Sequence, residues 1–284
     1  MKISISVNSL SIPGGLQNWA RTVSDELLRL NHRVTVVTDY IGTYAQVFNC
    51  EVANKFPKCD ISLVNNKDFL ERSNGFKIFT SHTFLTDKGR FSRGADTYVS
   101  ISKEIQYLEA KRGFNSTVIG NPVDFSLFRF TPTKKLDKVL FLSKDGRKAT
   151  LNILEACQKL GLKVLIVDHA HFANVQNLIK EADLVITSGR STVETMACGK
   201  NVLSANHRTI MKDFTGAGMI TPDNYLENMK DWFSGRYNPI YFNTDKLIEQ
   251  IKLYDSNYSQ ELNELTFKYF DVRKNVKKYL SLYG

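Results

Sequence analysis

The stretch from Ala182 to Ala205 constrains most strongly what this chain can fold into. It begins with the apolar, β-branched run Leu184–Thr187, which is typical of a buried parallel strand. A polar turn, a short helix over residues 193–198 and a strand from residue 201 follow, and Gly199 stands where a glycine ends a helix. The sequence therefore predicts a strand–helix–strand unit of a parallel α/β sheet.

The turn at residues 188–192 brings the start of this helix to the carboxyl end of the sheet. Free amides and the helix dipole favour an anion there. Glu194 follows within the first helical turn. A carboxylate there cannot bind the phosphates, because both are negatively charged, but it can bind neutral hydroxyls such as those of a ribose. We predict a bound nucleotide diphosphate, with its phosphates on the amides of Ser191 and Thr192 and its ribose on Glu194. The alternative is that Ser191 only caps the helix and Glu194 only complements its dipole.

The N-terminus has the same strand–helix–strand pattern. Residues 2–8 read as a strand, residues 16–30 as an amphipathic helix and residues 33–38 as a second strand. Gly14 and Gly15 lie in the loop after the first strand, where glycines let backbone amides approach a ligand closely. This unit also argues for a parallel sheet.

Further strands and helices alternate along the rest of the chain, apart from a Gly-rich segment after residue 205 that we expect to be irregular. At 284 residues the chain is long enough for two domains, each with its own core. We expect an α/β fold with two successive Rossmann-like sheets facing a cleft. The boundaries we predict are 1–128 for the first domain and 129–258 for the second, with residues 259–284 packing back on the first.

The composition is that of a water-soluble globular protein with a basic surface. Net charge is +9, and residues 1–135 hold 18 Lys and Arg against 12 Asp and Glu. This bias can attract a polyanion, such as nucleic acid or an anionic membrane, or it can simply keep the chain soluble. The four cysteines are scattered and none forms a metal-ligand pair, so we expect reduced thiols in a cytoplasmic protein.

A basic loop follows the strand predicted at residues 138–142. Lys144, Arg147 and Lys148 lie in it, directly before a predicted helix. They can clamp a diphosphate beside the Glu194 helix, or the loop can be an ordinary solvated turn. Two anion features at strand ends of one domain favour the first interpretation.

Five segments in order resemble GT-B glycosyltransferases, most closely glycosyltransferase family four. GGLQNWARTVSDELLRLNHRVTVVT resembles the family's opening loop, helix and strand, and YVSISKEI and GNPVDFSLF resemble two later motifs. KATLNILEA places Lys148 on the lysine that contacts the donor phosphate, and TVETMACGKNVL places Glu194 on the glutamate that contacts the nucleotide ribose. The first of the family's two glutamates is missing, and Gly189 and Arg190 occupy its place.

The resemblance implies a nucleotide-sugar co-substrate, most often a UDP-sugar, and a retaining transfer. Because Lys144, Arg147, Lys148 and helix amides can neutralise the diphosphate, we expect no metal ion and no other cofactor. The resemblance also implies that His82, at the end of a strand, lies near the transferred sugar. Without the resemblance, His82 reads as an ordinary strand-end histidine. A sugar-nucleotide epimerase of the same fold and a non-catalytic nucleic-acid-binding protein are the alternatives. The sequence predicts no oligomeric state.

The acceptor is predicted from one loop and from composition. Lys, Asn, Tyr and Phe are abundant, as in proteins of AT-rich phage genomes, and such phages glycosylate hydroxymethylated bases in DNA. We therefore expect DNA in a host cytoplasm as the acceptor, with a lipid-linked or polysaccharide acceptor at an anionic membrane as the alternative. The loop interleaves cations with an aromatic ring that can stack on an extruded base, and its residues are Lys88, Arg90, Phe91 and Arg93.

Overall fold

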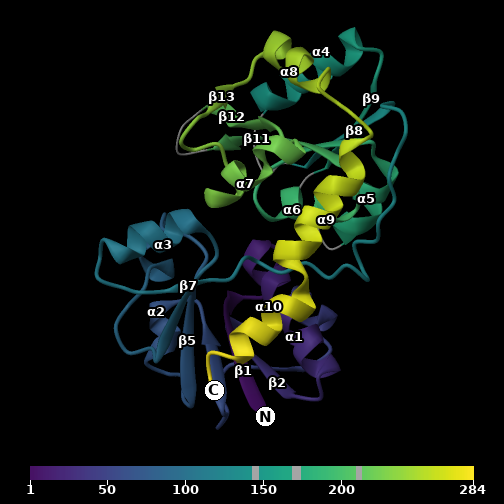
Figure 1. Cartoon of the computed structure of the whole chain (residues 1–284). Coiled ribbons are helices and arrows are strands. Elements are labelled where there is room, and N and C mark those ends of the chain that lie inside the picture. The colour runs from purple at the N-terminus through teal and green to yellow at the C-terminus, as the bar shows by residue number, and fades with distance from the viewer. Residues whose placement is uncertain (143–146, 168–173, 209–212) are drawn as a thin grey trace. The chain divides into compact units, whose positions relative to one another are not determined.

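The computed structural model describes residues 1–142, 147–167, 174–208 and 213–284. These residues form two compact units, each built on its own sheet (Figure 1). Unit 1 comprises Met1–Pro122 and Phe270–Gly284, and unit 2 comprises Val123–Tyr269. The predicted α/β class with two mostly parallel sheets is confirmed.

Unit 1 contains a seven-stranded parallel sheet in the order β3-β2-β1-β4-β5-β6-β7. The order of strands reverses between β1 and β4, and ligand sites of open α/β sheets lie at such a switch point. Residues 3–7 of β1 are buried without alternation, so helices must cover both faces of the sheet. The strands are β1 (Lys2–Ser9), β2 (Arg33–Tyr40), β3 (Glu51–Ala53), β4 (Ile61–Val64), β5 (Phe76–Ser81), β6 (Thr97–Ser100) and β7 (Thr117–Val118).

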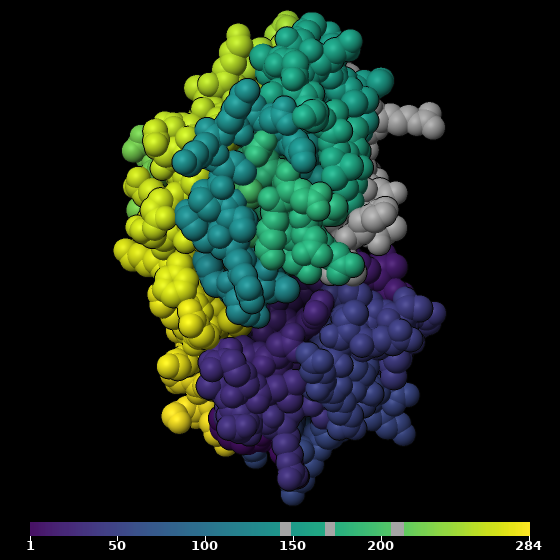
Figure 2. Space-filling model, turned by 90° about the vertical axis from the view of Figure 1, so that its right-hand side faces the viewer, coloured from purple at the N-terminus to yellow at the C-terminus, as the bar shows by residue number. Residues whose placement is uncertain are grey.

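The last helix of the chain belongs to unit 1. Its Tyr279 is buried, lies against the ring of Trp19 with a centroid distance of 6.3 Å, and bonds to Thr80. Figure 2 shows the C-terminal residues lying against the N-terminal residues of this unit. The helices are α1 (Gly15–Arg29), α2 (Lys67–Leu70), α3 (Lys103–Ala110) and α10 (Val272–Leu280), with the 3-10 turns η1 (Thr43–Val47) and η2 (Asp87–Gly89).

The described part of unit 2 contains a six-stranded sheet in the order β13-β12-β11-β10-β8-β9. Strands β8 to β11 are parallel, and β12 and β13 extend the sheet antiparallel. The switch point lies between β8 and β10, which pair directly. The strands are β8 (Lys138–Leu142), β9 (Lys163–Val167), β10 (Leu184–Thr187), β11 (Asn201–Arg208), β12 (Asp213–Met219) and β13 (Ile240–Tyr241).

One face of this sheet packs against two helices, α4 and α8, through a cluster of apolar side chains. Val139 and Phe141 of β8 and Leu184 and Ile186 of β10 belong to that cluster. The helices are α4 (Arg147–Lys159), α5 (Val175–Glu181), α6 (Arg190–Ala197), α7 (Pro222–Lys230), α8 (Thr244–Ile251) and α9 (Tyr258–Phe270).

Two features of the fold differ from the sequence-based expectation. The Gly-rich segment that we expected to be irregular contains β12, which lies so close to β11 that a Cβ atom on Gly216 would be 2.0 Å from Ser204 O. The C-terminal residues divide: α9 falls in unit 2 except for Phe270, and α10 falls in unit 1. A side chain on Gly120 would meet the Phe270 ring, with 2.4 Å to its Cε1 atom, so a glycine is needed where the returning chain docks.

No helix among the described residues is both long and apolar enough to cross a lipid bilayer.

Candidate functional site

The two predicted anion-binding loops of unit 2 start side by side. Strands β8 and β10 are hydrogen-bonded neighbours, and the Thr187 hydroxyl at the end of β10 donates to Leu142 O at the end of β8, 3.3 Å away. Helix α4 follows β8 and α6 follows β10, so both helices begin at the switch point. Arg147 and Lys148 are the first two residues of α4, but Lys144 and the side chains of Arg147 and Lys148 lie outside the described residues.

Helix α6 begins three residues earlier than expected, at Arg190. Its N-cap is Gly189, which has a φ of 67° and makes no side-chain cap, so the alternative interpretation, in which Ser191 only caps the helix, is wrong. The left-handed backbone at this position favours glycine. The Thr192 amide already donates to Gly189 O at 3.2 Å, so of the two amides predicted to bind phosphate, Thr192 has another partner in this state.

Glu194 and Arg190 form a buried ion pair one helical turn apart. Arg190 Nε lies 2.6 Å from Glu194 Oε1, and the side chains are 7 % and 3 % exposed. Because α6 starts at Arg190, Glu194 lies in its second turn rather than in its first. The carboxylate is therefore held through Oε1 by an arginine of its own helix, and its contact with a ribose stays a prediction.

The glycine loop of unit 1 ends in a second helix N-terminus without a side-chain cap. Gly14 is the N-cap of α1, and no acidic residue lies in the first turn. A Cβ atom on Gly15 would meet nothing within 4 Å, so the space beside it is open. A ligand can approach the first turn of α1 there, and this is consistent with the predicted role of both glycines.

His82 follows β5 and is half-buried. Its ring meets the ring of Trp19 edge-on, with a centroid distance of 4.8 Å. The histidine therefore lies at the carboxyl end of the sheet, as predicted, and a packed tryptophan fixes its ring. Its catalytic role stays a prediction.

Three cations of the predicted acceptor loop are exposed, but the loop also carries acidic partners. Lys88 Nζ lies 2.5 Å from Asp68 Oδ2, and this bond raises the pKa of Lys88 above its usual range. Lys67 pairs with Asp87, and Arg90 Nε donates to Phe84 O at 2.8 Å. Arg93 is exposed. Exposed ion pairs contribute little stability, so a phosphate can compete with these carboxylates.

Phe91 does not lie on the surface of this loop. It is 2 % exposed, and its ring packs against Phe79, Tyr98 and Phe114 at centroid distances of 5.6, 4.8 and 5.7 Å. Burial in an aromatic cluster excludes the predicted stacking of this ring on an extruded base. Phe91 is a core residue that anchors the loop, and we withdraw it from the acceptor site.

A group of side-chain amides at the unit 1 switch point was not predicted from the sequence. Asn66 Nδ2 donates to Asn8 Oδ1 at 2.8 Å, which joins the ends of β1 and β4. Asn65 is 5 % exposed, and within the described residues its Oδ1 atom has no hydrogen-bond partner. An Asn-Asn pair directly after a buried strand was the signal that could have found them.

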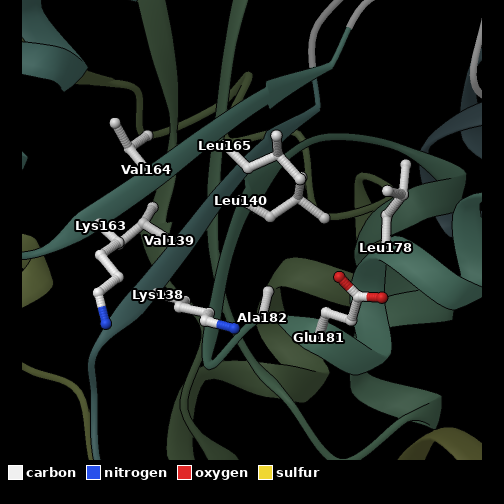
Figure 3. Close-up of a pocket in the computed structure, with 9 residues that line it drawn as sticks. All are labelled: Lys138, Val139, Leu140, Lys163, Val164, Leu165, Leu178, Glu181 and Ala182. Atoms are coloured by element: carbon white, nitrogen blue, oxygen red, sulfur yellow. The ribbon is translucent and has the colours of Figure 1, made fainter.

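A cavity of about 220 Å³ lies elsewhere in unit 2. Figure 3 shows Leu140, Leu165 and Leu178 around an apolar hollow, with Lys138 and Glu181 at its rim. Lys138 begins β8 and Glu181 ends α5, so the cavity opens at the amino ends of the strands, away from the switch-point loops. Leu165, on the edge strand β9, is 47 % exposed.

No group of three or more His, Cys, Asp or Glu side chains in the described parts of the chain could hold a metal ion. The cysteines among them are free thiols. Burial raises the pKa of Cys157 to about 11 and that of Cys198 to about 12, which makes both poor nucleophiles.

Comparison with known proteins identifies the fold. No protein-family profile matches the sequence, and no curated protein sequence matches it. An α-glucosyltransferase solved with UDP and a 13-mer DNA containing an HMU base superposes with a TM-score of 0.60 at 13% identity, over 100% of this chain and 99% of that one. The fold is that of GT-B glycosyltransferases.

Two other structures show how widely this fold is used. MurG of Acinetobacter baumannii superposes with a TM-score of 0.57 at 10% identity, over 99% of this chain and 98% of that one. A UDP-GlcNAc 2-epimerase from Neisseria meningitidis, bound to UDP-GlcNAc, superposes with a TM-score of 0.59 at 12% identity, over 99% of both chains. Identities this low establish the fold alone, so the chemistry has to be argued from the residues.

Proposed function

We propose that the chain is a glycosyltransferase that transfers a sugar from a UDP-sugar to an acceptor hydroxyl. The observation that carries the proposal is the pairing of β8 with β10, because α4, which begins with Arg147 and Lys148, follows β8, and α6 follows β10. Cations and helix amides together suit a diphosphate. The GT-B fold, shared with a structure that contains UDP, supports the same ligand.

In this proposal the cations act on the leaving group. Negative charge grows on the UDP oxygen as the bond to the sugar breaks, and Lys148, with Lys144 or Arg147, offsets it. His82 of unit 1 orients or deprotonates the acceptor hydroxyl. Glu194 binds the ribose. We propose retention of the anomeric configuration, which NMR of the released product checks directly.

Substitution of Lys148 tests the donor site. Lys148→Ala should lower kcat by about a hundredfold, because one charge partner of the leaving group is lost. Lys159→Ala is the matched control, since Lys159 lies at the other end of α4 and pairs with Glu155 at the surface. Equal activity of the Lys148 and Lys159 variants would contradict the assignment of the diphosphate to this helix end.

We further propose that the acceptor is a hydroxymethylated base in DNA. The exposed Lys88, Arg90 and Arg93 supply phosphate contacts on unit 1, where the buried Phe91 holds their loop in place. One structural neighbour was solved with a DNA that contains an HMU base, and this supports the same acceptor class. A lipid-linked acceptor at an anionic membrane is the second candidate, since the same cations would serve there.

A parallel acceptor panel separates these possibilities. Hydroxymethylated DNA, unmodified DNA and a lipid phosphate are each incubated with nucleotide sugars, and mass spectrometry shows which acceptor gains the sugar. Turnover of a nucleotide sugar without any acceptor, with a changed sugar configuration, would instead indicate an epimerase. Transfer of the sugar to the lipid alone would exclude DNA as the acceptor but would still support a glycosyltransferase.

Salt dependence tests the DNA contacts. DNA affinity should fall steeply with salt, and charge reversal of Lys88, Arg90 and Arg93 should flatten that dependence, because each phosphate contact releases condensed counterions. The matched control is charge reversal of Lys2, Lys55 and Lys58, which are exposed elsewhere on unit 1. This control should reduce the salt dependence of DNA affinity less than charge reversal of the loop does. UDP binding by unit 2 should change little in both triple variants.

A further inference from the structure

A short loop after α7 has a costly backbone conformation. Trp232 and Phe233 are consecutive and both left-handed, with φ of 63° and 55°. Bulky non-glycine residues rarely adopt this conformation, because the Cβ atom then crowds the backbone. Such strain persists only where surrounding contacts enforce it, and it concentrates at functional positions.

Hydrogen bonds around Asp231 enforce the conformation. Asp231 is 5 % exposed, and its carboxylate accepts from Ser234 N, Ser234 Oγ and Arg236 N at 3.1, 3.0 and 2.9 Å. The Phe233 amide donates to Asn228 O at 2.6 Å. The chain therefore holds this loop in one shape, and the shape sets where the two aromatic side chains go.

The two rings have different surroundings. Phe233 is fully buried against Tyr225, with a ring-centroid distance of 5.1 Å, so core packing explains its position. Trp232 is only half-buried. Its Nε1 atom lies 3.8 Å from where a Cβ atom of Gly189 would be, which places the indole against the N-cap of α6. The strain at Trp232 therefore brings an aromatic ring to the start of this helix.

A second feature of the same helix end points to a ligand. Thr192 is fully buried, and within the described parts of the chain its hydroxyl has no hydrogen-bond partner. Thr192 is the third residue of α6, so its hydroxyl lies in the first turn of the helix, at the end where Trp232 lies. A buried polar atom without a partner is costly, and an oxygen-rich ligand would satisfy it.

We propose that Trp232 forms one wall of the donor site and that its indole packs against a ring joined to the diphosphate at α6. The indole offers a broad apolar face, and both sugars and nucleosides present a flat or apolar ring face to such a surface. This inference rests on the proposed function, because it takes a nucleoside diphosphate as the ligand of α6. The ring is either the nucleoside or the transferred sugar.

Fluorescence gives a direct readout, because the chain contains two tryptophans. Trp19 is fully buried in unit 1, whereas Trp232 is half-buried beside the proposed ligand. UDP should change the tryptophan emission of the wild-type chain. It should leave the emission of Trp232→Phe nearly constant, although calorimetry should still detect UDP binding to that variant. A full fluorescence response in Trp232→Phe would overturn the inference.

Removal of the ring separates a ligand contact from a structural role. Trp232→Gly relieves the left-handed strain, so the unfolding midpoint should stay within about 3 °C of wild type. UDP affinity should nevertheless fall about tenfold, as expected for the loss of one stacked ring. Tyr237→Gly is the matched control, because Tyr237 is an exposed aromatic of the same loop, 62 % exposed, and should bind UDP as wild type does. A Trp232→Gly chain that loses stability but binds UDP normally would show a structural role only.

The probes also identify which ring is contacted. If Trp232→Gly weakens UDP and UDP-glucose equally, the indole contacts the nucleoside. If it weakens UDP-glucose more than UDP, the indole contacts the transferred sugar. A wild-type chain that binds neither probe would refute the proposed function itself, whereas equal binding by wild type and variant would refute only the role of Trp232.

Discussion

Arg190 and Glu194 form a buried ion pair within α6, with 2.6 Å between Nε and Oε1. The pair lies directly after the left-handed Gly189 at the switch point of unit 2. Its burial makes it the most costly electrostatic feature of the proposed donor site, because neither charge can be left alone in a desolvated position.

We therefore expect Arg190→Ala to lower the free energy of unfolding by about 3–5 kcal/mol. The reason is that Glu194 is left buried without its counter-charge. Urea denaturation measures the effect. Lys230→Ala is the control, since Lys230 and Glu227 form an exposed pair of similar spacing, which should contribute about 0–1 kcal/mol. Similar losses in both variants would mean that the Arg190 pair is solvated.

Phe91→Ala should unfold the acceptor loop rather than remove a stacking contact. Truncation of a phenylalanine in a packed core costs about 3–5 kcal/mol, and Phe91 packs among three aromatic rings. Leu85→Ala in the same region should change stability by less than about 0.5 kcal/mol, because Leu85 is 57 % exposed. Thermal unfolding distinguishes them, and a fully stable Phe91→Ala chain would contradict the burial of this ring.

Activity should persist in a chelator. In the proposed donor site the charge of the diphosphate is offset by Lys144, Arg147, Lys148 and the amides of α6, so the reaction does not depend on a divalent ion. Transfer is measured after dialysis against EDTA, with and without added Mg²⁺ or Mn²⁺. If dialysis abolishes transfer and an added metal ion restores it, the prediction is wrong, and carboxylate ligands must lie near the diphosphate.

Cys157 and Cys198 should resist alkylation in the folded chain. Burial raises their pKa values to about 11 and about 12, so at pH 8 the reactive thiolate is depleted relative to an ordinary cysteine. Mass spectrometry after a timed exposure to iodoacetamide measures the labelling of each site. The same chain in urea is the control and should label both sites quickly. Rapid labelling of the folded chain would show that these helices open locally.

The individual strands and helices follow from short-range sequence patterns. The runs of apolar, β-branched residues predicted β8 and β10 at their observed bounds, because residue periodicity and turn residues act over short distances. The sequence also predicted the fold class and the loop that opens α6. It failed for β12, since DFTGAGM has the low strand propensity of glycine and forms a strand only through close contact with β11.

Which side chains meet depends instead on contacts between residues that are far apart in the sequence. An aromatic residue in a loop reads the same whether it is buried or exposed, so contacts distant in sequence buried Phe91 and left Trp232 beside Gly189. The pairing of Arg190 with Glu194 depended on where α6 begins, and a left-handed glycine set that point. The C-terminal residues divided between the units because Phe270 packs at Gly120, 150 positions earlier in the chain. These arrangements depend on packing between residues that are distant in sequence, and local sequence patterns do not predict such packing.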